Sequence, residues 1–137
     1  MKRTFESLSN ASRGYVSYKG GEGQLSFLLH RITGLGTLLF LTIHIVDTAM
    51  VYFYPELYTE AIKLYQSPLF MIGEIGLVFS VIFHGVNGLR IAYLDLFKPK
   101  KWRIDSQRSA VRWTLGLSII LWLPAAVIMF SNLLAHL

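Results

Sequence analysis

The stretch ITGLGTLLFLTIHIVDTAMVYF, residues 32–53, decides how this chain must fold. Its side chains are almost all apolar, and a helix of about 20 such residues crosses the roughly 30 Å hydrocarbon core of a bilayer. The stretch therefore predicts a membrane-spanning helix. It also carries two ionisable side chains, His44 and Asp47, whose presence in such a segment needs an explanation.

Composition supports a membrane protein. Of the 137 residues, 53% are hydrophobic and only 15% are charged, against about 25% charged in soluble domains. Two further apolar blocks occupy residues 71–94 and 113–134. The first block follows a polar segment and is longer than a signal-peptide core, so we do not interpret it as a signal peptide. The sequence predicts an all-α membrane protein with three transmembrane helices.

Cysteine is absent from the chain, so disulfides, iron-sulfur ligation and a thiol nucleophile are excluded. Redox or metal chemistry would have to use histidine or a bound cofactor. The net charge of +5 does not indicate nucleic-acid binding, because the basic residues lie beside the apolar blocks. Such a placement is typical of membrane topology.

The basic residues predict the orientation. Twelve of them precede the first block or lie between residues 90 and 112, and only Lys63 lies in the other loop. By the positive-inside rule the N-terminus is cytoplasmic and the C-terminus is outside. We therefore predict a cytoplasmic N-terminal arm, residues 1–31, and a three-helix membrane anchor domain, residues 32–137.

The outer loop, YPELYTEAIKLYQSPLF at residues 54–70, has apolar residues at helical spacing between Pro55 and Pro68. Tyrosine and phenylalanine suit the membrane interface, so we predict a short interfacial helix here. Three spans form a thin bundle that hides few polar groups from lipid. We therefore expect a second membrane subunit as a partner within the lipid bilayer.

Ionisable and polar side chains within or beside the spans mark candidate functional positions, because such groups are costly in a bilayer and usually face protein, cofactor or water. They are His30, Arg31, His44, Asp47, Glu74, His84, Asn87, Arg90 and Asp95. Position alone also allows a snorkelling arginine and an interfacial carboxylate at the end of the second span. Glu74 can be explained as an acid at a helix N-terminus. No role is assigned to His136.

His84 lies deep in the second span, with Gly85 and Gly88 beside it. A missing side chain one turn away on the same face leaves a shelf for a flat ligand. A neutral imidazole is a normal axial ligand of haem, so His84 with Gly88 predicts a haem site. The alternative is a neutral histidine bonded to a neighbouring helix, since glycine is also common where membrane helices pack.

His44 is a second candidate ligand at a different depth. It lies about 21 Å along the first helix from His30, whereas His84 lies about 16 Å from Asp95 at the same side of the membrane. This offset means that the two histidines cannot easily ligate one iron. If both bind haem, they bind different haems, each with a second ligand from another chain.

Ser26, His30 and Arg31 place a hydroxyl, an imidazole and a guanidinium at the start of the first span. Such a group can pair with a haem propionate or polarise and protonate a quinone carbonyl. The alternative is that these residues only form a basic cluster at the end of a transmembrane helix and bind no ligand.

Two of these stretches carry a family resemblance: SFLLHRITG at residues 26–34 and HGVNGLRIAYLD at residues 84–95. With this separation in a three-span chain, they resemble the cytochrome b membrane-anchor subunit of succinate dehydrogenase, over residues 22–134. The resemblance implies that His84 is an axial ligand of haem b. It implies that His30 and Arg31 lie at the quinone pocket and the haem propionates. Arg90 and Asp95 would then lie at the docking face for the soluble subunits.

The chain departs from the family pattern at two positions. The family serine usually lies three residues before the histidine, where this chain has Phe27, and Ser26 is displaced by one. Ile91 stands where some members carry another histidine. His44 within LTIHIVD resembles the first-helix ligand of two-haem, menaquinone-linked members, which implies a second haem.

The resemblance implies a haem b-binding anchor that passes electrons from the iron-sulfur subunit to quinone and holds the flavoprotein and iron-sulfur subunits at a prokaryotic cytoplasmic membrane. Succinate would be oxidised on another subunit, so this chain has no catalytic residue of its own. An anchor of a quinol:fumarate reductase is the related alternative. A proton-coupled transporter subunit using His44, Asp47 and Glu74, or a purely structural anchor, are alternatives from other classes.

Overall fold

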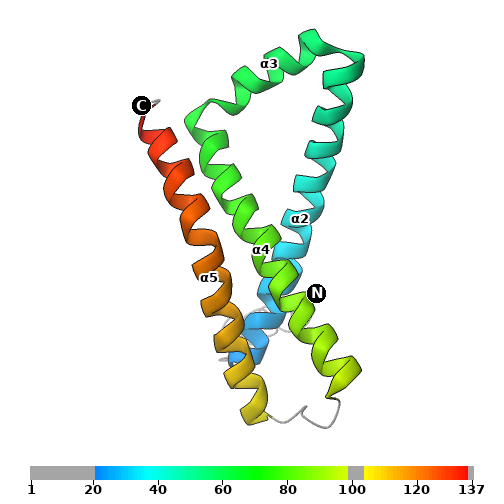
Figure 1. The fold of residues 1–137 in the computed structure, drawn as a ribbon, viewed down its shortest axis with the longest axis vertical. Helices are drawn as coiled ribbons and strands as arrows, with labels where there is room; N and C mark the ends of the chain where they lie inside the picture. The colour runs from blue at the N-terminus through cyan, green and yellow to red at the C-terminus, as the bar shows by residue number, and fades with distance from the viewer. Residues whose placement is uncertain (1–20, 99–103, 136–137) are drawn as a thin grey trace, which may run out of the picture.

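The computed structural model describes residues 21–98 and 104–135, and this part of the chain forms four helices (Figure 1). These are α2 (Glu22–Phe53), α3 (Pro55–Tyr65), α4 (Pro68–Phe97) and α5 (Ile104–Ala135). Helices α2 and α4, and residues 107–135 of α5, are long and apolar enough to cross a membrane. The predictions of an all-α fold and of three spans are confirmed. The helix predicted in the outer loop is present as α3, and its place at the interface stays a prediction.

The helices extend beyond the predicted spans. Helix α2 begins at Glu22 rather than at Ile32, so it includes residues 22–31 of the predicted arm, whose remainder lies outside the described residues. Its 32 residues measure about 48 Å, well beyond the roughly 30 Å of hydrocarbon. The apolar block in the sequence marks only the part of the helix that lipid surrounds. The predicted span is therefore shorter than the observed helix. Glu22 in the first turn is also favourable, because it faces the positive end of the helix dipole.

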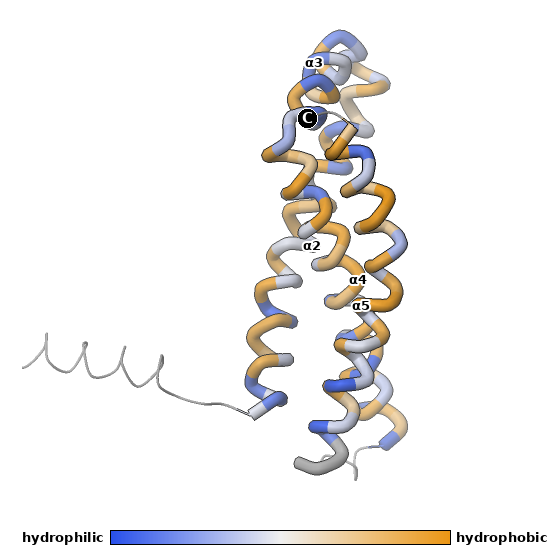
Figure 2. Tube along the Cα trace, turned by 90° about the vertical axis from the view of Figure 1, so that its left-hand side faces the viewer, coloured by the Kyte–Doolittle hydropathy of each residue, from blue (hydrophilic) through white to orange (hydrophobic). Residues whose placement is uncertain are grey.

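Helix α4 packs against both α2 and α5, whereas α3 bridges the far ends of α2 and α4 (Figure 1). We call the end formed by the starts of α2 and α5 and the end of α4 the basic end. The opposite end, capped by α3, is the α3 end. Hydrophobic residues run along all three long helices, and most hydrophilic residues lie near the two ends (Figure 2). This distribution fits a bundle whose long axis crosses the bilayer.

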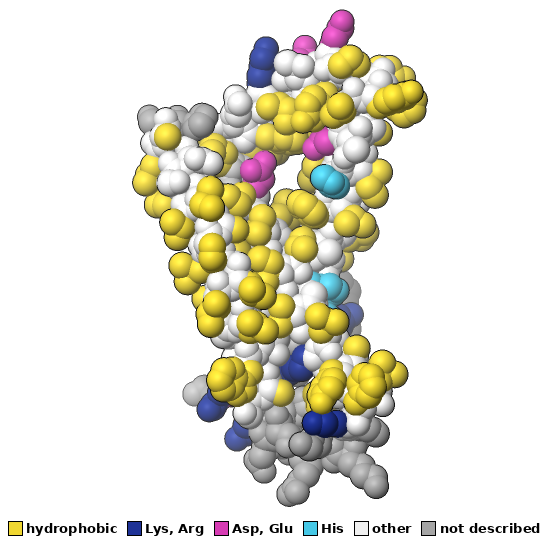
Figure 3. All heavy atoms as spheres, in the orientation of Figure 1, with side chains coloured by type: hydrophobic (Ala, Val, Ile, Leu, Met, Phe, Trp, Pro, Cys, Tyr) yellow, Lys and Arg dark blue, Asp and Glu magenta, His cyan; other side chains and the backbone are white. Residues whose placement is uncertain are grey.

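The packed interior is small and partly polar. Its buried polar side chains are Ser26, Thr33, Asn87, Thr114 and Ser118, and its buried hydrophobic ones are Phe83, Leu94, Val111 and Leu133. Most large apolar side chains are exposed instead (Figure 3). Membrane helices associate through small and polar contacts rather than through hydrophobic burial. The exposed apolar surface is therefore available to lipid or to another membrane subunit.

Helices α2 and α4 lie close together at Gly36 and Ser80. A Cβ added to Gly36 would lie 2.7 Å from the Ser80 Oγ and 2.9 Å from the Ser80 Cβ. Atoms in contact cannot approach so closely, and the Ser80 Cβ cannot move without its helix. Glycine at position 36 is thus required for this crossing of α2 over α4.

We expect Gly36→Ala to lower the thermal stability of the detergent-solubilised protein, because overpacking costs roughly 1–3 kcal/mol. Adding Ser80→Gly should restore part of the loss by removing the opposing Cβ. Gly76→Ala is the matched control, since nothing lies within 4 Å of an added Cβ there. Equal melting temperatures for Gly36→Ala and Gly76→Ala would contradict the proposed crossing.

Candidate functional site

Polar side chains from α2 and α4 meet between the helix crossing and the basic end. The Ser26 hydroxyl donates a hydrogen bond to Asn87 Oδ1 at 3.1 Å. Both side chains are almost fully buried, with 1% and 0% of their surface exposed. Buried polar groups without partners are costly, so this bond pins α2 to α4 at one relative rotation.

His30 and His84 lie next to this pair. Their rings stack with centroids 4.1 Å apart and nearly parallel planes, and His84 Nδ1 lies 3.1 Å from the His30 carbonyl oxygen. A carbonyl only accepts hydrogen bonds, so Nδ1 carries the proton and Nε2 keeps its lone pair. Histidines that ligate metals are commonly held in this way, with the second nitrogen free for the metal. The held imidazole of His84 therefore fits an axial haem ligand.

The glycine that admits the His84 ring is Gly34, on the opposite helix. A Cβ added to Gly34 would lie 3.0 Å from His84 Cε1. At Gly88, where the sequence predicted a shelf, the His30 ring is in ordinary contact range, with Cε1 3.8 Å from the position of an added Cβ. Sequence reasoning about α4 alone missed this role of Gly34. The glycines at positions 34 and 36, close together in α2, were the available signal for a near approach between helices.

The two arginines predicted near this site lie differently from each other. Arg31 is exposed, with its guanidinium carbon 5.4 Å from the centre of the Phe27 ring. Arg90 instead has its Nε and Nη1 atoms buried, and it is close enough to His30 to interact electrostatically. Asp95 is exposed near the end of α4. The structure thus brings together Ser26, His30, His84 and Arg90, and leaves Arg31 and Asp95 on the surface.

The remaining predicted ligand, His44, lines a separate cavity at the α3 end. This cavity has a volume of about 580 Å³ and lies between α2, α3 and α4. Acidic and histidine side chains gather around it in Figure 3. Its polar lining residues are His44, Asp47, Tyr65 and Glu74, and its other walls are mainly aliphatic and aromatic. A mainly apolar pocket with a few polar groups is typical of a small-molecule or cofactor site.

Asp47 is held by the loop helix rather than by another span. The Tyr65 hydroxyl of α3 donates a hydrogen bond to Asp47 Oδ1 at 3.1 Å. Partial burial raises the pKa of the Tyr65 phenol, and the bond to Asp47 raises it further, so Tyr65 stays a donor. The sequence did not predict this pairing, because it depends on how α3 folds back over α2.

The helix crossing separates the two regions. His84 lies four residues beyond Ser80, about 6 Å along α4 toward the basic end. His44 lies eight residues beyond Gly36, about 12 Å along α2 toward the α3 end. His84 is not among the residues that line the α3-end cavity. The two histidines therefore lie at different depths, as the sequence predicted.

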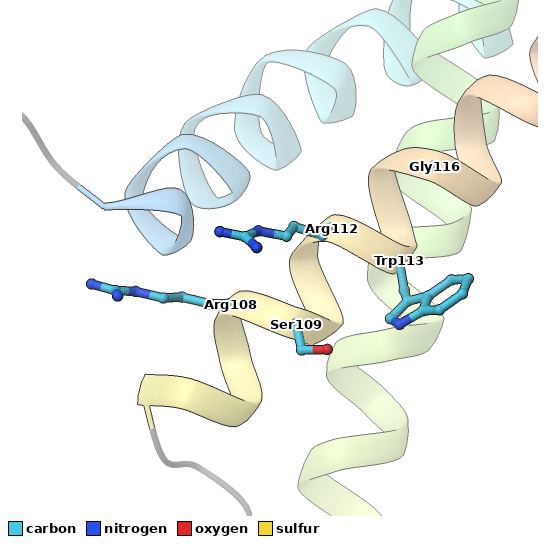
Figure 4. A pocket seen from close by; sticks show the side chains of 5 residues that line it. All are labelled: Arg108, Ser109, Arg112, Trp113 and Gly116. Atoms are coloured by element: carbon cyan, nitrogen blue, oxygen red, sulfur yellow. The ribbon is translucent and has the colours of Figure 1, made fainter.

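A third feature is an open groove of about 560 Å³ at the basic end, lined by Arg108, Ser109, Arg112, Trp113 and Gly116 (Figure 4). Arg108 and Arg112 extend in the same direction toward the start of α2. The Arg112 Nε donates to both Glu22 carboxylate oxygens, at 2.9 and 3.0 Å. Because this pair is exposed, its main effect is to hold the starts of α2 and α5 together rather than to add much stability.

Comparison with known proteins agrees with a membrane-spanning chain. Residues 9–130 match the model of the family described as succinate dehydrogenase/fumarate reductase transmembrane subunit. The succinate dehydrogenase 2 membrane subunit SdhC of Mycobacterium tuberculosis (strain ATCC 25618 / H37Rv) is 31% identical over 122 residues, which cover 87% of this chain and 85% of that protein.

The chain therefore belongs to the family of succinate dehydrogenase and fumarate reductase transmembrane subunits. Within that family it is an SdhC-type anchor, as the sequence motifs predicted. It is a multi-pass membrane subunit of a complex II enzyme, and such a subunit works with soluble catalytic subunits.

The Ser26 to Asn87 contact can be tested by Ser26→Ala. We expect a loss of about 1–3 kcal/mol of stability, because Asn87 Oδ1 would be left buried without its donor. Thermal unfolding of the detergent-solubilised protein measures this loss. Ser131→Ala is the control, since Ser131 is exposed and bonds within its own helix. A change no larger than that of the control would show that the contact does not hold α2 to α4.

Proposed function

We propose that this chain binds haem b through His84 and passes electrons from the iron-sulfur subunit of its complex to quinone. The observation that carries the proposal is the His84 imidazole, whose Nδ1 is bound to the His30 carbonyl oxygen. That bond orients the ring and leaves Nε2 as the ligating atom. Bound haem would supply reversible one-electron chemistry at this position.

The neighbours of His84 support the same assignment. Gly34 leaves room for the ring, and the stacked His30 ring covers one of its faces. A bound haem would take a second ligand, which we assign to a second membrane-anchor subunit. The exposed apolar surfaces of the three spans offer that subunit a place to pack.

Quinone or haem-propionate contacts are proposed for the start of α2. His30 lies beside His84, and Arg31 projects from the surface close by. Arg31 is therefore available to a quinone carbonyl or a propionate outside this chain's own bundle. Ser26 already donates its hydroxyl proton to Asn87, so it would offer quinone only an acceptor oxygen. This arrangement favours His30 and Arg31 over Ser26 as hydrogen-bond donors to quinone.

The flavoprotein and iron-sulfur subunits would dock at the basic end, which the charge asymmetry predicts to be cytoplasmic. Asp95 is exposed there and is available for such contacts. We propose that the complex lies in a prokaryotic cytoplasmic membrane. We also propose that it oxidises succinate and reduces quinone. Fumarate reduction by quinol is the related alternative, because the family includes both enzymes.

A second haem is proposed for the α3-end cavity, with His44 as its ligand from this chain. The cavity is about 580 Å³, largely apolar, and separated from His84 by the helix crossing. The Phe40 ring stacks on His44 with centroids 5.7 Å apart, which helps to orient the imidazole. The other ligand would come from the second anchor subunit, and menaquinone would be the expected quinone partner.

The haem site at His84 is tested in the complete complex. We expect His84→Ala to abolish its bis-histidine haem spectrum, and Gly34→Ala to reduce it, because an added methyl would displace the His84 ring. Optical and paramagnetic resonance spectra, normalised to flavin, give the haem content.

Gly85→Ala is the matched control, since it adds the same methyl group beside His84 where nothing lies within 4 Å. It should leave the haem spectrum unchanged. Undiminished haem in His84→Ala would reject the assignment, whereas a loss in Gly85→Ala equal to that in Gly34→Ala would reject the role of Gly34.

For the second haem, we expect His44→Ala to halve the haem-to-flavin ratio while the spectrum of the His84 haem persists. The reason is that each histidine would serve a different iron. Pyridine haemochrome content against covalently bound flavin is the measurement. An unchanged ratio in His44→Ala would exclude the second haem and leave the first in place.

A further inference from the structure

A set of buried nitrogen atoms near the basic end has no hydrogen-bond partner. Within the described residues these atoms are His30 Nδ1, Asn87 Nδ2, Arg90 Nε, Arg90 Nη1 and Gln107 Nε2. No buried side-chain oxygen in the same ranges shares this condition. Guanidinium and amide nitrogens are hydrogen-bond donors only. The group that completes this region must therefore be an acceptor.

Of these groups, Arg90 is the most costly to leave without a partner. A guanidinium stays protonated in proteins, and an unpaired buried charge is far more costly than an unpaired neutral group. Snorkelling does not remove this cost, because Nε and Nη1 are themselves buried rather than directed to water. A neutral carbonyl could accept a hydrogen bond, but only an anion would also balance the charge.

The described part of this chain does not supply that anion. Glu22, on the neighbouring helix, is engaged by Arg112, and Asp95 is exposed at the end of α4. No ion pair of Arg90 occurs among the side chains that the structure describes, those of residues 21–98 and 107–135. The partner of the Arg90 guanidinium therefore lies outside this described part.

Asn87 adds a second donor to the same region. It lies three residues before Arg90, so the two side chains are neighbours on the surface of α4. Its Oδ1 is occupied by the Ser26 hydroxyl, and its Nδ2 remains unpaired. The bond from Ser26 thereby determines which end of the amide is free. Arg90 and Asn87 together present donors suited to the oxygens of one carboxylate.

We propose that Arg90 and Asn87 form a binding site for one carboxylate supplied from outside this chain. The carboxylate belongs to a haem propionate or to an acidic side chain of the second membrane subunit. The first source rests on the proposed haem function, and the second does not. This role differs from the docking role that the sequence predicted for Arg90, and it rests on the burial of the Arg90 Nε and Nη1 atoms.

Arg90→Gln in the complete complex tests the site, with Arg108→Gln as a matched control that removes one exposed arginine from the same end. Losing charge-assisted hydrogen bonds of about 1.5–3 kcal/mol corresponds to roughly 10- to 100-fold weaker binding of the carboxylate. Arg90→Lys keeps the charge but loses the fork geometry, and it should give a smaller loss. If the Arg90→Gln complex does not assemble, the same measurements are made on Arg90→Lys.

Two measurements distinguish the sources of the carboxylate. If it is a propionate, Arg90→Gln weakens haem retention and lowers the haem reduction potential, because an unpaired anion favours ferric iron. If it belongs to the partner subunit, haem potential is unchanged but the second subunit dissociates more readily on size-exclusion chromatography, even in a His84→Ala background.

Indistinguishable results for Arg90→Gln and Arg108→Gln in both measurements would overturn the carboxylate site. Failure of the haem proposal looks different. A complex without haem in which Arg90→Gln still releases the partner subunit would keep this site while rejecting haem binding.

Discussion

The close crossing of α2 and α4 at Gly36 and Ser80 is the constraint on which the rest of the structure depends. It brings the helices together without intervening side chains. On one side of it, His30 and His84 stack and Ser26 reaches Asn87. On the other side the helices diverge, and α3 bridges them over the cavity lined by His44 (Figure 1). One contact between small residues thus separates two regions with different chemistry.

The membrane setting explains why the polar groups of this chain are so specifically arranged. Lipid offers no hydrogen bonds, so each buried polar group needs a protein or cofactor partner. Hydroxyls such as Thr114 and Ser118 bond to carbonyls of their own helix. In the part of the chain that the structure describes, Arg90 Nε, Arg90 Nη1 and Asn87 Nδ2 have no such partner. The proposed carboxylate from another component of the complex would supply the missing acceptor.

The fold was largely predictable, because span length and charge distribution follow from bilayer thickness and residue hydropathy. The predicted spans lie inside α2, α4 and α5, and the helix in the outer loop is present as α3. Helix ends were less predictable, since residues 22–31 are helical beyond the apolar block. Of the candidate site, the family motifs identified His30 and His84. The burial of two Arg90 nitrogens and the role of Gly34 escaped prediction, because both depend on how α2 and α4 rotate against each other.

The sequence by itself determined that three helices cross a membrane and that the chain is an SdhC-type anchor. Both follow from local properties: apolar length, basic flanks and two short motifs. Only the tertiary structure decided which polar residues meet. It paired Ser26 with Asn87 and Asp47 with Tyr65, and it buried two nitrogens of Arg90 while leaving Arg31 exposed. The physical reason is that a helix presents residues in every direction, and only its crossing with a neighbour selects the direction that becomes the site.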